Sequence, residues 1–180
     1  NGPNRDFAAD SGGNNDTGGT AGCLDWQGDA VYFAGATSVS STNAKYRALA
    51  LKIDGKTGDL VWQQAWEPVE GDKPASNSAL AYAVDAQGAD VLVTGETKGG
   101  VLVASLGKAA GEVRWTRALS LGGTNEAGWA IRTDGKGGAW IGADSDGKAV
   151  LARLTGLDKE PSLESVQTVS FGDKGRINHI

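Results

Sequence analysis

The sequence predicts an all-β fold built from short strands and tight turns, and three observations lead to that class. Glycine supplies 28 of the 180 residues, about twice its ordinary share, and glycine adopts the backbone conformations that tight turns need. No segment longer than about eight residues carries the apolar stripe of an amphipathic helix. The third observation is an internal repeat, which organises most of the chain.

The repeat has two blocks. The first block occurs at 21–35, 81–95 and 128–142, which align without gaps at shifts of 60 and 47 residues. This alignment superimposes two sets of glycines, namely Gly28, Gly88 and Gly135, and Gly35, Gly95 and Gly142. The second block occurs at 47–62, 100–115 and 148–156. Both blocks follow one another in the same order each time, so we interpret them as a true repeat.

Each repeat is expected to form four antiparallel strands joined by glycine-containing turns. In the second repeat we expect the strands at Ala79–Asp85, Asp90–Gly95, Val101–Leu106 and Glu112–Leu119. The turns between them contain Gly88, Gly99-Gly100 and Gly111, which can take positive φ without a Cβ clash.

Tandem four-stranded units of about 50–60 residues are typical of a β-propeller, in which each unit is a blade. The innermost strands of a propeller pack closely and favour small residues, and Ala79, Ala81 and Ala83 alternate along the expected first strand. The second block ends on Trp62 and Trp115. We expect these tryptophans at the end of the fourth strand, packed between neighbouring blades.

The expected organisation is a Gly/Asn-rich connector at 1–18 followed by propeller repeats over 19–180. The repeats are 19–76, 77–125 and 126–174, and 175–180 begins a further blade. Closed propellers have about four to eight blades. The missing blades would come from the same longer chain or from oligomer partners, and a stack of sheets that is not a propeller is the remaining alternative. A first residue other than Met favours a processed chain or part of a longer one.

Three segments resemble known propeller repeats. The run DGKTGDLVW at 54–62 resembles the pyrroloquinoline-quinone-type repeat, and VDAQGADVLVTGET at 84–97 resembles the bacterial SBBP repeat. Residues 151–177 are similar to the delta-sixty repeat, with an ARL-type strand and an FG-x-x-G turn. These resemblances imply a repeat-propeller scaffold and no shared activity, because such scaffolds carry function on their loops. No group of acid, Asn and Arg matches the cofactor ligands of the quinoprotein enzymes.

Composition excludes several classes of function. A net charge of −5 and a pI of about 4.9 leave no basic footprint for nucleic acid, and no apolar run is long enough for a membrane span. One Cys and one His cannot build a His/Cys zinc site or a disulfide framework. We therefore expect no cofactor, no metal site and no catalytic set. Cys23 is expected to be a small buried hydrophobe, and His179 a structural residue of an innermost strand.

Some polar segments remain as candidates. Asp144 and Asp146 are spaced as at the start of a calcium loop, although a hairpin turn explains Asp146-Gly147 without a metal. The connection at 67–78 carries Glu67, Glu70 and Asp72, which suit a cation, a basic partner or an ordinary solvated loop. The loop at 36–46 is rich in Ser, Thr and Asn, which suits contacts to sugar or protein as well as a plain polar loop.

The function we expect is a non-catalytic β-propeller that is secreted, periplasmic or on a cell surface. It would act as a binding or structural module, or as an accessory subunit, with a protein or carbohydrate partner. The alternative is a fragment of a propeller enzyme, such as a quinoprotein-like dehydrogenase or a hydrolase, whose active site lies outside this segment. The sequence by itself assigns no residue to partner binding.

Overall fold

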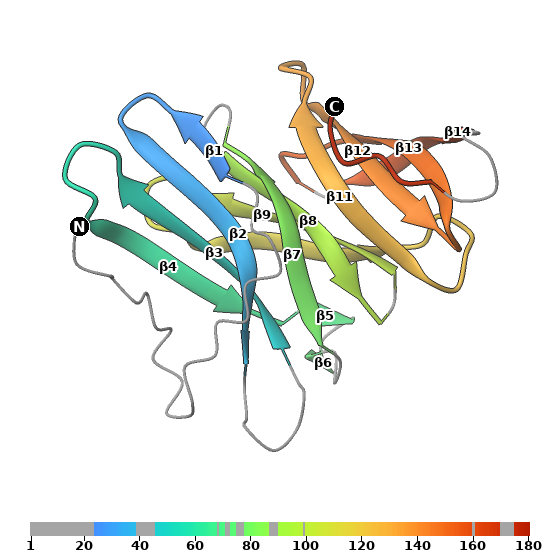
Figure 1. Cartoon of the computed structure of the whole chain (residues 1–180), viewed down its shortest axis with the longest axis horizontal. Coiled ribbons are helices and arrows are strands. Elements are labelled where there is room, and N and C mark those ends of the chain that lie inside the picture. The colour runs from blue at the N-terminus through green and yellow to red at the C-terminus, as the bar shows by residue number, and fades with distance from the viewer. Residues whose placement is uncertain are drawn as a thin grey trace.

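The computed structural model is all-β (Figure 1). It describes residues 24–38, 46–67, 69–70, 73–74, 78–86, 90–98, 100–159, 161–169 and 175–180. Over these residues the chain forms strands and turns and no helix. Nothing in this described part is therefore a helix of the length and apolarity that a membrane crossing needs.

Twelve strands form three four-stranded antiparallel sheets, each in chain order. The first sheet contains β1 (Leu24–Gln27), β2 (Ala30–Ser38), β3 (Tyr46–Asp54) and β4 (Leu60–Trp66). The second contains β7 (Ala79–Asp85), β8 (Asp90–Thr97), β9 (Gly100–Gly107) and β10 (Val113–Leu119). The third contains β11 (Glu126–Thr133), β12 (Gly138–Ser145), β13 (Lys148–Thr155) and β14 (Ser162–Val169). A short ladder joins β5 (Val69–Glu70) to β6 (Lys73–Pro74).

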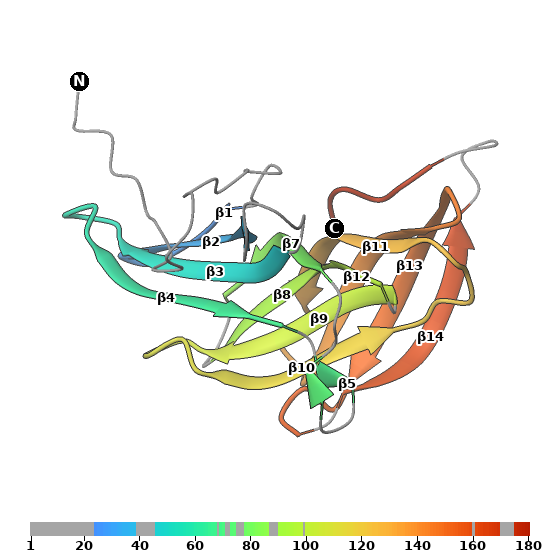
Figure 2. The same cartoon turned by 90° about the horizontal axis from the view of Figure 1, so that it is seen from below.

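The sheets pack face to face and do not close into a barrel, because each is a separate ladder over the described residues. Figure 2 shows the first strands β1, β7 and β11 along one side of the molecule and the fourth strands along the opposite side. Strand β7 lies across β2 and β3 of the first sheet, and β11 lies across β8 and β9 of the second. The first strand of one sheet is thus the element that covers the preceding sheet.

Two apolar clusters fill the spaces between successive sheets. The cluster between the first and second sheets contains many alanines around Tyr32, Trp62 and Trp66. The cluster between the second and third sheets is built around Trp115, Ile141 and Leu154. Small residues on the first strands let the sheets approach closely, as the sequence predicted for Ala79 and Ala81, which are fully buried.

The strand prediction for the second repeat is confirmed. Strand β7 has the expected bounds, and the other three strands differ by one or two residues at their ends. The turn glycines behave as expected where they are described: φ is +62° at Gly28, +130° at Gly100 and +77° at Gly111.

The gap-free alignment of the third repeat is wrong after its first turn. Asp85 pairs with Leu92 in the second sheet, whereas Arg132 pairs with Trp140 in the third. The turn between the first two strands is therefore one residue longer in the third sheet than in the second. Gly142 therefore lies opposite Ala130, the place that Thr94 holds in the second sheet. Because side chains alternate along a strand, the extra residue moves the glycine to the other face of the sheet.

The expected alternation of Ala79, Ala81 and Ala83 is also interrupted. The register of β7 against β8 shifts between Ala81 and Ala83, which makes Tyr82 the extra residue of a β-bulge. As a result Ala81 packs in the cluster with the first sheet, whereas Ala83 packs in the cluster with the third. One strand thus contributes small residues to both interfaces.

Trp62 and Trp115 pack between neighbouring sheets, as predicted. The Trp62 indole Nε1 donates to the Lys108 carbonyl at 3.2 Å, and Trp115 Nε1 donates to the Leu157 carbonyl at 2.8 Å. Each acceptor lies in the turn between the third and fourth strands of the next sheet. Their expected place at the end of the fourth strand is wrong, since each is the third residue of its strand.

A second contact between sheets is repeated in the same way. Asp25 Oδ2 accepts from the Ala86 backbone N at 2.8 Å, and Asp85 Oδ2 accepts from the Thr133 backbone N at 2.6 Å. Both aspartates lie in the first strand of one sheet, and each binds the backbone at the end of the first strand of the next. In the third sheet the equivalent position is Arg132, which donates to Asp85.

Residues 175–180 lie on the third sheet but are not a strand. The Gly175 backbone N donates to the Gly147 carbonyl at 2.8 Å, and Ile177 lies against Gly142. The expectation that His179 belongs to an innermost strand is therefore wrong, and its side chain is exposed.

Candidate functional site

Three side chains stack on the side of the molecule where the first strands lie. The rings of Tyr82 in β7 and Trp129 in β11 are parallel within 4°, with centroids 4.5 Å apart. The Arg176 guanidinium carbon lies 4.5 Å from the Trp129 ring centroid. We call Tyr82, Trp129 and Arg176 the first-strand stack. Its members lie 47 residues apart, which is the shift that relates the first strands of the second and third repeats.

Both aromatic members are bulge residues. The register of β11 against β12 shifts between Gly128 and Ala130, which makes Trp129 the extra residue, just as Tyr82 is in β7. A bulge adds a residue that has no partner in the ladder and turns its side chain away from the regular alternation. The same local irregularity therefore presents an aromatic ring from each of two successive sheets.

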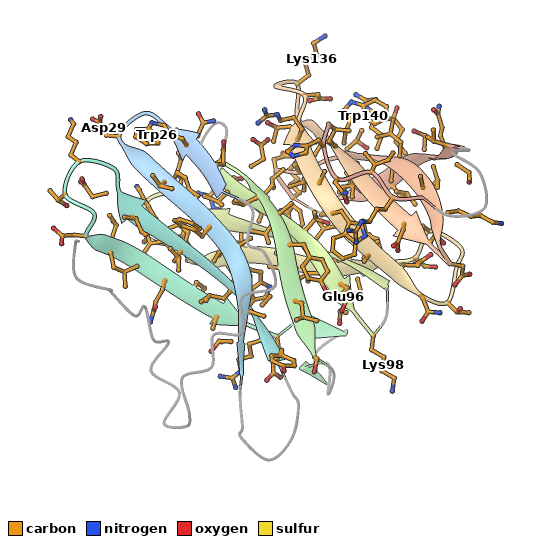
Figure 3. All side chains as sticks on the ribbon, viewed as in Figure 1. Trp26, Asp29, Glu96, Lys98, Lys136 and Trp140 are labelled. Atoms are coloured by element: carbon orange, nitrogen blue, oxygen red, sulfur yellow. The ribbon has the colours of Figure 1, made fainter. Side chains whose placement is uncertain are left out.

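Each ring contacts a carboxylate of its own sheet. Trp129 Nε1 donates to Asp144 Oδ2 at 3.3 Å, and the Tyr82 hydroxyl hydrogen-bonds to the Glu96 carboxylate. Glu96 pairs with Val101 in the second sheet, and Asp144 pairs with Ala149 in the third. Both partners lie near the start of the third strand of their sheet, so the two carboxylates hold equivalent positions. In Figure 3, Glu96 lies near the end of β8 in the lower middle of the view, whereas Trp26 and Asp29 lie at the upper left.

The electrostatic setting of Tyr82 is that of a neutral donor beside anions. Burial, the hydrogen bond to Glu96 and the negative charge of Asp144 all raise the pKa of the Tyr82 phenol. The hydroxyl thus stays protonated far above neutral pH and donates to the Glu96 carboxylate. Two carboxylates and two rings together form an anionic and aromatic surface.

The first repeat lacks this pair. By the shift of 60 residues, the position of Tyr82 corresponds to Gly22 in the sequence, and that of Glu96 corresponds to Ala36. Both an aromatic ring and a carboxylate are therefore absent from that repeat at once. The pair Tyr82–Glu96 and the pair Trp129–Asp144 form the two units of the candidate site.

Chemically, this arrangement suits binding. Aromatic faces attract cations through their negative quadrupole, and carboxylates accept hydrogen bonds from charged donors. Over the described ranges no three His, Cys, Asp or Glu side chains gather closely enough to hold a metal ion.

The structure confirms the turn interpretation of Asp144–Gly147. Asp146 has a φ of +50°, and its carboxylate accepts from the backbone N of Thr124 and of Asn125. These hydrogen bonds lower the pKa of Asp146. Asp144 instead points to Trp129, so the two aspartates bind different partners.

The loops singled out in the sequence lie mainly outside the described residues. Glu67 is described and pairs with Arg47 Nε at 3.1 Å, and the Tyr46 backbone N donates to Ser78 Oγ at 3.1 Å. Residues 39–45 and 75–77, the side chain of Glu70, all of Asp72, and Cys23 lie outside the described part.

The first-strand stack was not predicted from the sequence. The signal was present, because the shift of 47 residues that relates the second and third repeats superimposes Tyr82 on Trp129 and Trp129 on Arg176. The repeated glycines predict the turns, but they do not indicate which side chains stack. The carboxylates were harder to find, since Glu96 aligns with Asp144 only after the one-residue correction to the third repeat.

No protein family matches the chain, and no curated protein resembles it closely enough to count as related.

Proposed function

We propose that this protein is a non-catalytic binding module that uses the first-strand stack and its carboxylates to hold a partner. The observation that carries the proposal is the duplication of the pair of ring and carboxylate, at equivalent bulges in two sheets. Bulges are common at sites that present a side chain to a ligand. A merely structural bulge would not need a carboxylate at the matching position of the next strand.

We further propose that the three sheets are blades of a β-propeller and that 175–180 begins another. Support comes from the repeated contacts, in which an aspartate and a tryptophan of one sheet each bind the backbone of the next. Arg176 also continues the stack at the spacing of the repeat. Under this proposal the first strands line the central channel, and the stack faces it. The remaining blades belong to a longer chain or to oligomer partners.

The resemblance to SBBP, delta-sixty and quinone-type repeats fits this architecture and remains part of the proposal. With it we propose a secreted, periplasmic or cell-surface location, where such a module would bind a protein or a carbohydrate.

An array experiment tests the binding proposal. The labelled chain would be applied to immobilised neutral oligosaccharides and to short peptides of varied charge. We expect binding to some members that falls about tenfold in Tyr82→Ala and in Glu96→Gln, the loss of about 1.4 kcal/mol of contact energy. Thermal melting of each variant shows that the loss does not come from unfolding.

Trp26→Ala is the matched control. Trp26 is the most exposed tryptophan of the described part at 62%, and it lies in β1 of the first sheet, outside the first-strand stack. Its replacement should leave array binding unchanged. The proposal fails if no binding depends on Tyr82 or Glu96, or if Trp26→Ala abolishes binding to the same extent.

A further inference from the structure

The chemistry of the first-strand stack narrows the class of partner, on the condition that the proposed binding function holds. Its two rings are accompanied by two carboxylates and by one cation, Arg176, so the side chains leave a surplus of one negative charge. Over the described residues of the four strands that carry the stack and its carboxylates (β7, β8, β11 and β12), the one other cation is Arg132 in β11, which is paired with Asp85, and Lys98 follows the end of β8. An uncharged sugar would leave this charge unmatched.

One end of the stack already holds a guanidinium group. Arg176 lies over Trp129, which is hydrogen-bonded to Asp144, so a cation, a ring and a carboxylate meet there. The segment that carries Arg176 contacts the third sheet through the Gly175–Gly147 hydrogen bond and through Ile177 against Gly142. The interaction of the guanidinium with the Trp129 ring is a further contact, and it places this exposed side chain on the stack.

The other end of the stack also has an aromatic ring and a carboxylate, but no cation of the stack lies there. Tyr82 stacks on Trp129 through one face, and Glu96 accepts from its hydroxyl. The first repeat supplies neither a ring nor a carboxylate at the matching positions, where the sequence has Gly22 and Ala36. Among the described residues, the order of groups in the stack is thus guanidinium, Trp129 and Tyr82.

We propose that the Tyr82 end of the stack, together with Glu96, binds the guanidinium or ammonium group of an arginine or lysine side chain from a protein partner. The bound group would lie on the Tyr82 ring and donate to the Glu96 carboxylate. It would repeat at this end the contact that Arg176 makes with Trp129 at the other.

Titrations with single amino-acid amides test the proposal on the whole chain. The probes are N-acetyl-arginine amide, N-acetyl-lysine amide and the uncharged isostere N-acetyl-citrulline amide, with the side-chain resonances of Tyr82 and Trp129 followed by NMR. We expect saturable shifts with arginine and lysine and at least about tenfold weaker binding of citrulline. Glu96→Gln should weaken arginine binding about tenfold, since a charge-assisted hydrogen bond is lost. Glu112→Gln, which alters an exposed glutamate outside the stack, should leave binding unchanged.

The outcomes separate the possible failures. If citrulline amide binds as tightly as arginine amide, or if Glu96→Gln leaves arginine binding unchanged, the assignment of a cationic ligand is overturned. Spermidine binding as tight as that of arginine amide overturns the assignment to a protein side chain in favour of a free polyamine. Oligosaccharide binding that needs Tyr82, without arginine binding, refutes this inference and leaves the proposed function intact. If neither class binds, both proposals fail.

Discussion

At the scale of single residues, the contacts between sheets depend on a few polar atoms that are buried with their partners. Asp85 is fully buried, and its two oxygens accept from the Thr133 backbone N and from Arg132. A buried carboxylate is tolerated when its oxygens are hydrogen-bonded in this way. The residue therefore fixes the distance between the ends of β7 and β11.

Replacing this carboxylate should be costly. We expect Asp85→Ala to lower the free energy of unfolding by about 1–3 kcal/mol, because the partly buried Thr133 N–H loses its acceptor. Asp29→Ala is the control: its ion pair with Lys56 is largely exposed and should contribute about 0–1 kcal/mol. Chemical denaturation of both variants measures the difference, and equal effects would contradict the role given to Asp85.

Tyr82 should also make the protein sensitive to alkali. Its folded pKa is raised above the ordinary value of 10.0, so at high pH the unfolded chain releases a proton that the folded chain retains. Stability linked to this phenol is complete below about pH 10 and is lost as the pH rises further. Melting temperatures between pH 8 and 11 should fall less steeply in Tyr82→Phe than in the parent chain. Parallel slopes would show that the phenol is not held in this way.

At the scale of elements, equivalent turns meet different surroundings. Gly58 and Gly111 end the same turn in the first and second sheets, with φ of +73° and +77° and matching hydrogen bonds to Asp54 and Gly107. A Cβ on Gly58 would meet open space, whereas a Cβ on Gly111 would come within 2.6 Å of the Trp62 ring. The second turn is therefore also the platform on which Trp62 packs.

These two turns provide a matched pair. Gly58→Ala should cost about 1–2 kcal/mol, the strain of a left-handed residue that has a Cβ. Gly111→Ala should cost more than this, because the Trp62 ring must move as well and loses its fit to the Lys108 carbonyl. Thermal unfolding of the two variants side by side checks the order, and an equal loss would show that Trp62 shifts without strain.

The strands themselves could be predicted from the sequence, because the alternation of apolar residues and the turn glycines are local signals. The bounds of β7 followed from its alanines and the turn after it. The bulges at Tyr82 and Trp129 could not be read, since an extra residue leaves the local composition unchanged and appears only in the pairing with the next strand. For the same reason the position of Gly142 was misjudged, and the carboxylate partners of the stack were missed.

At the scale of the whole molecule, the same two contacts link the first sheet to the second and the second to the third, but the third sheet lacks the residues that make them. The first and second sheets each offer an aspartate and a tryptophan to the next sheet. The third has Arg132 in place of the aspartate and, by its pairing with Arg153, Ser165 in place of the tryptophan. Any further sheet packed on this face would therefore be held by other contacts, among them those of the large side chain of Trp140.

Acid should destabilise the whole assembly of sheets. Backbone N–H groups in turns lower the pKa of Asp54 and Asp146, and they lower that of Asp134 to about 2 with help from Arg153. Each folded pKa lies below its unfolded value of about 3.9, so stability is present above that pH and is lost as the pH falls toward 2.

The test for Asp134 is its amide variant. Asp134→Asn should be less stable than the parent chain at pH 7 and should lose less stability between pH 5 and 2, as followed by denaturant titration. Asp158→Asn, at an exposed turn position, should keep the slope of the parent. A parent chain whose stability is flat over this range would contradict the assignment.

The bulge at Tyr82 gives that residue a second role, as a spacer in the chain. Ala79 and Ala81 before it pack with the first sheet, whereas Ala83 and Asp85 after it, at the same alternate spacing, face the third sheet. The number of residues in β7 therefore determines which way Asp85 points. Substituting Tyr82 removes a ring and leaves this count intact. Deleting the residue would turn Asp85 away from Thr133 and bring Ala83 to the opposite face, so insertions and deletions in the first strands should be tolerated far less than substitutions.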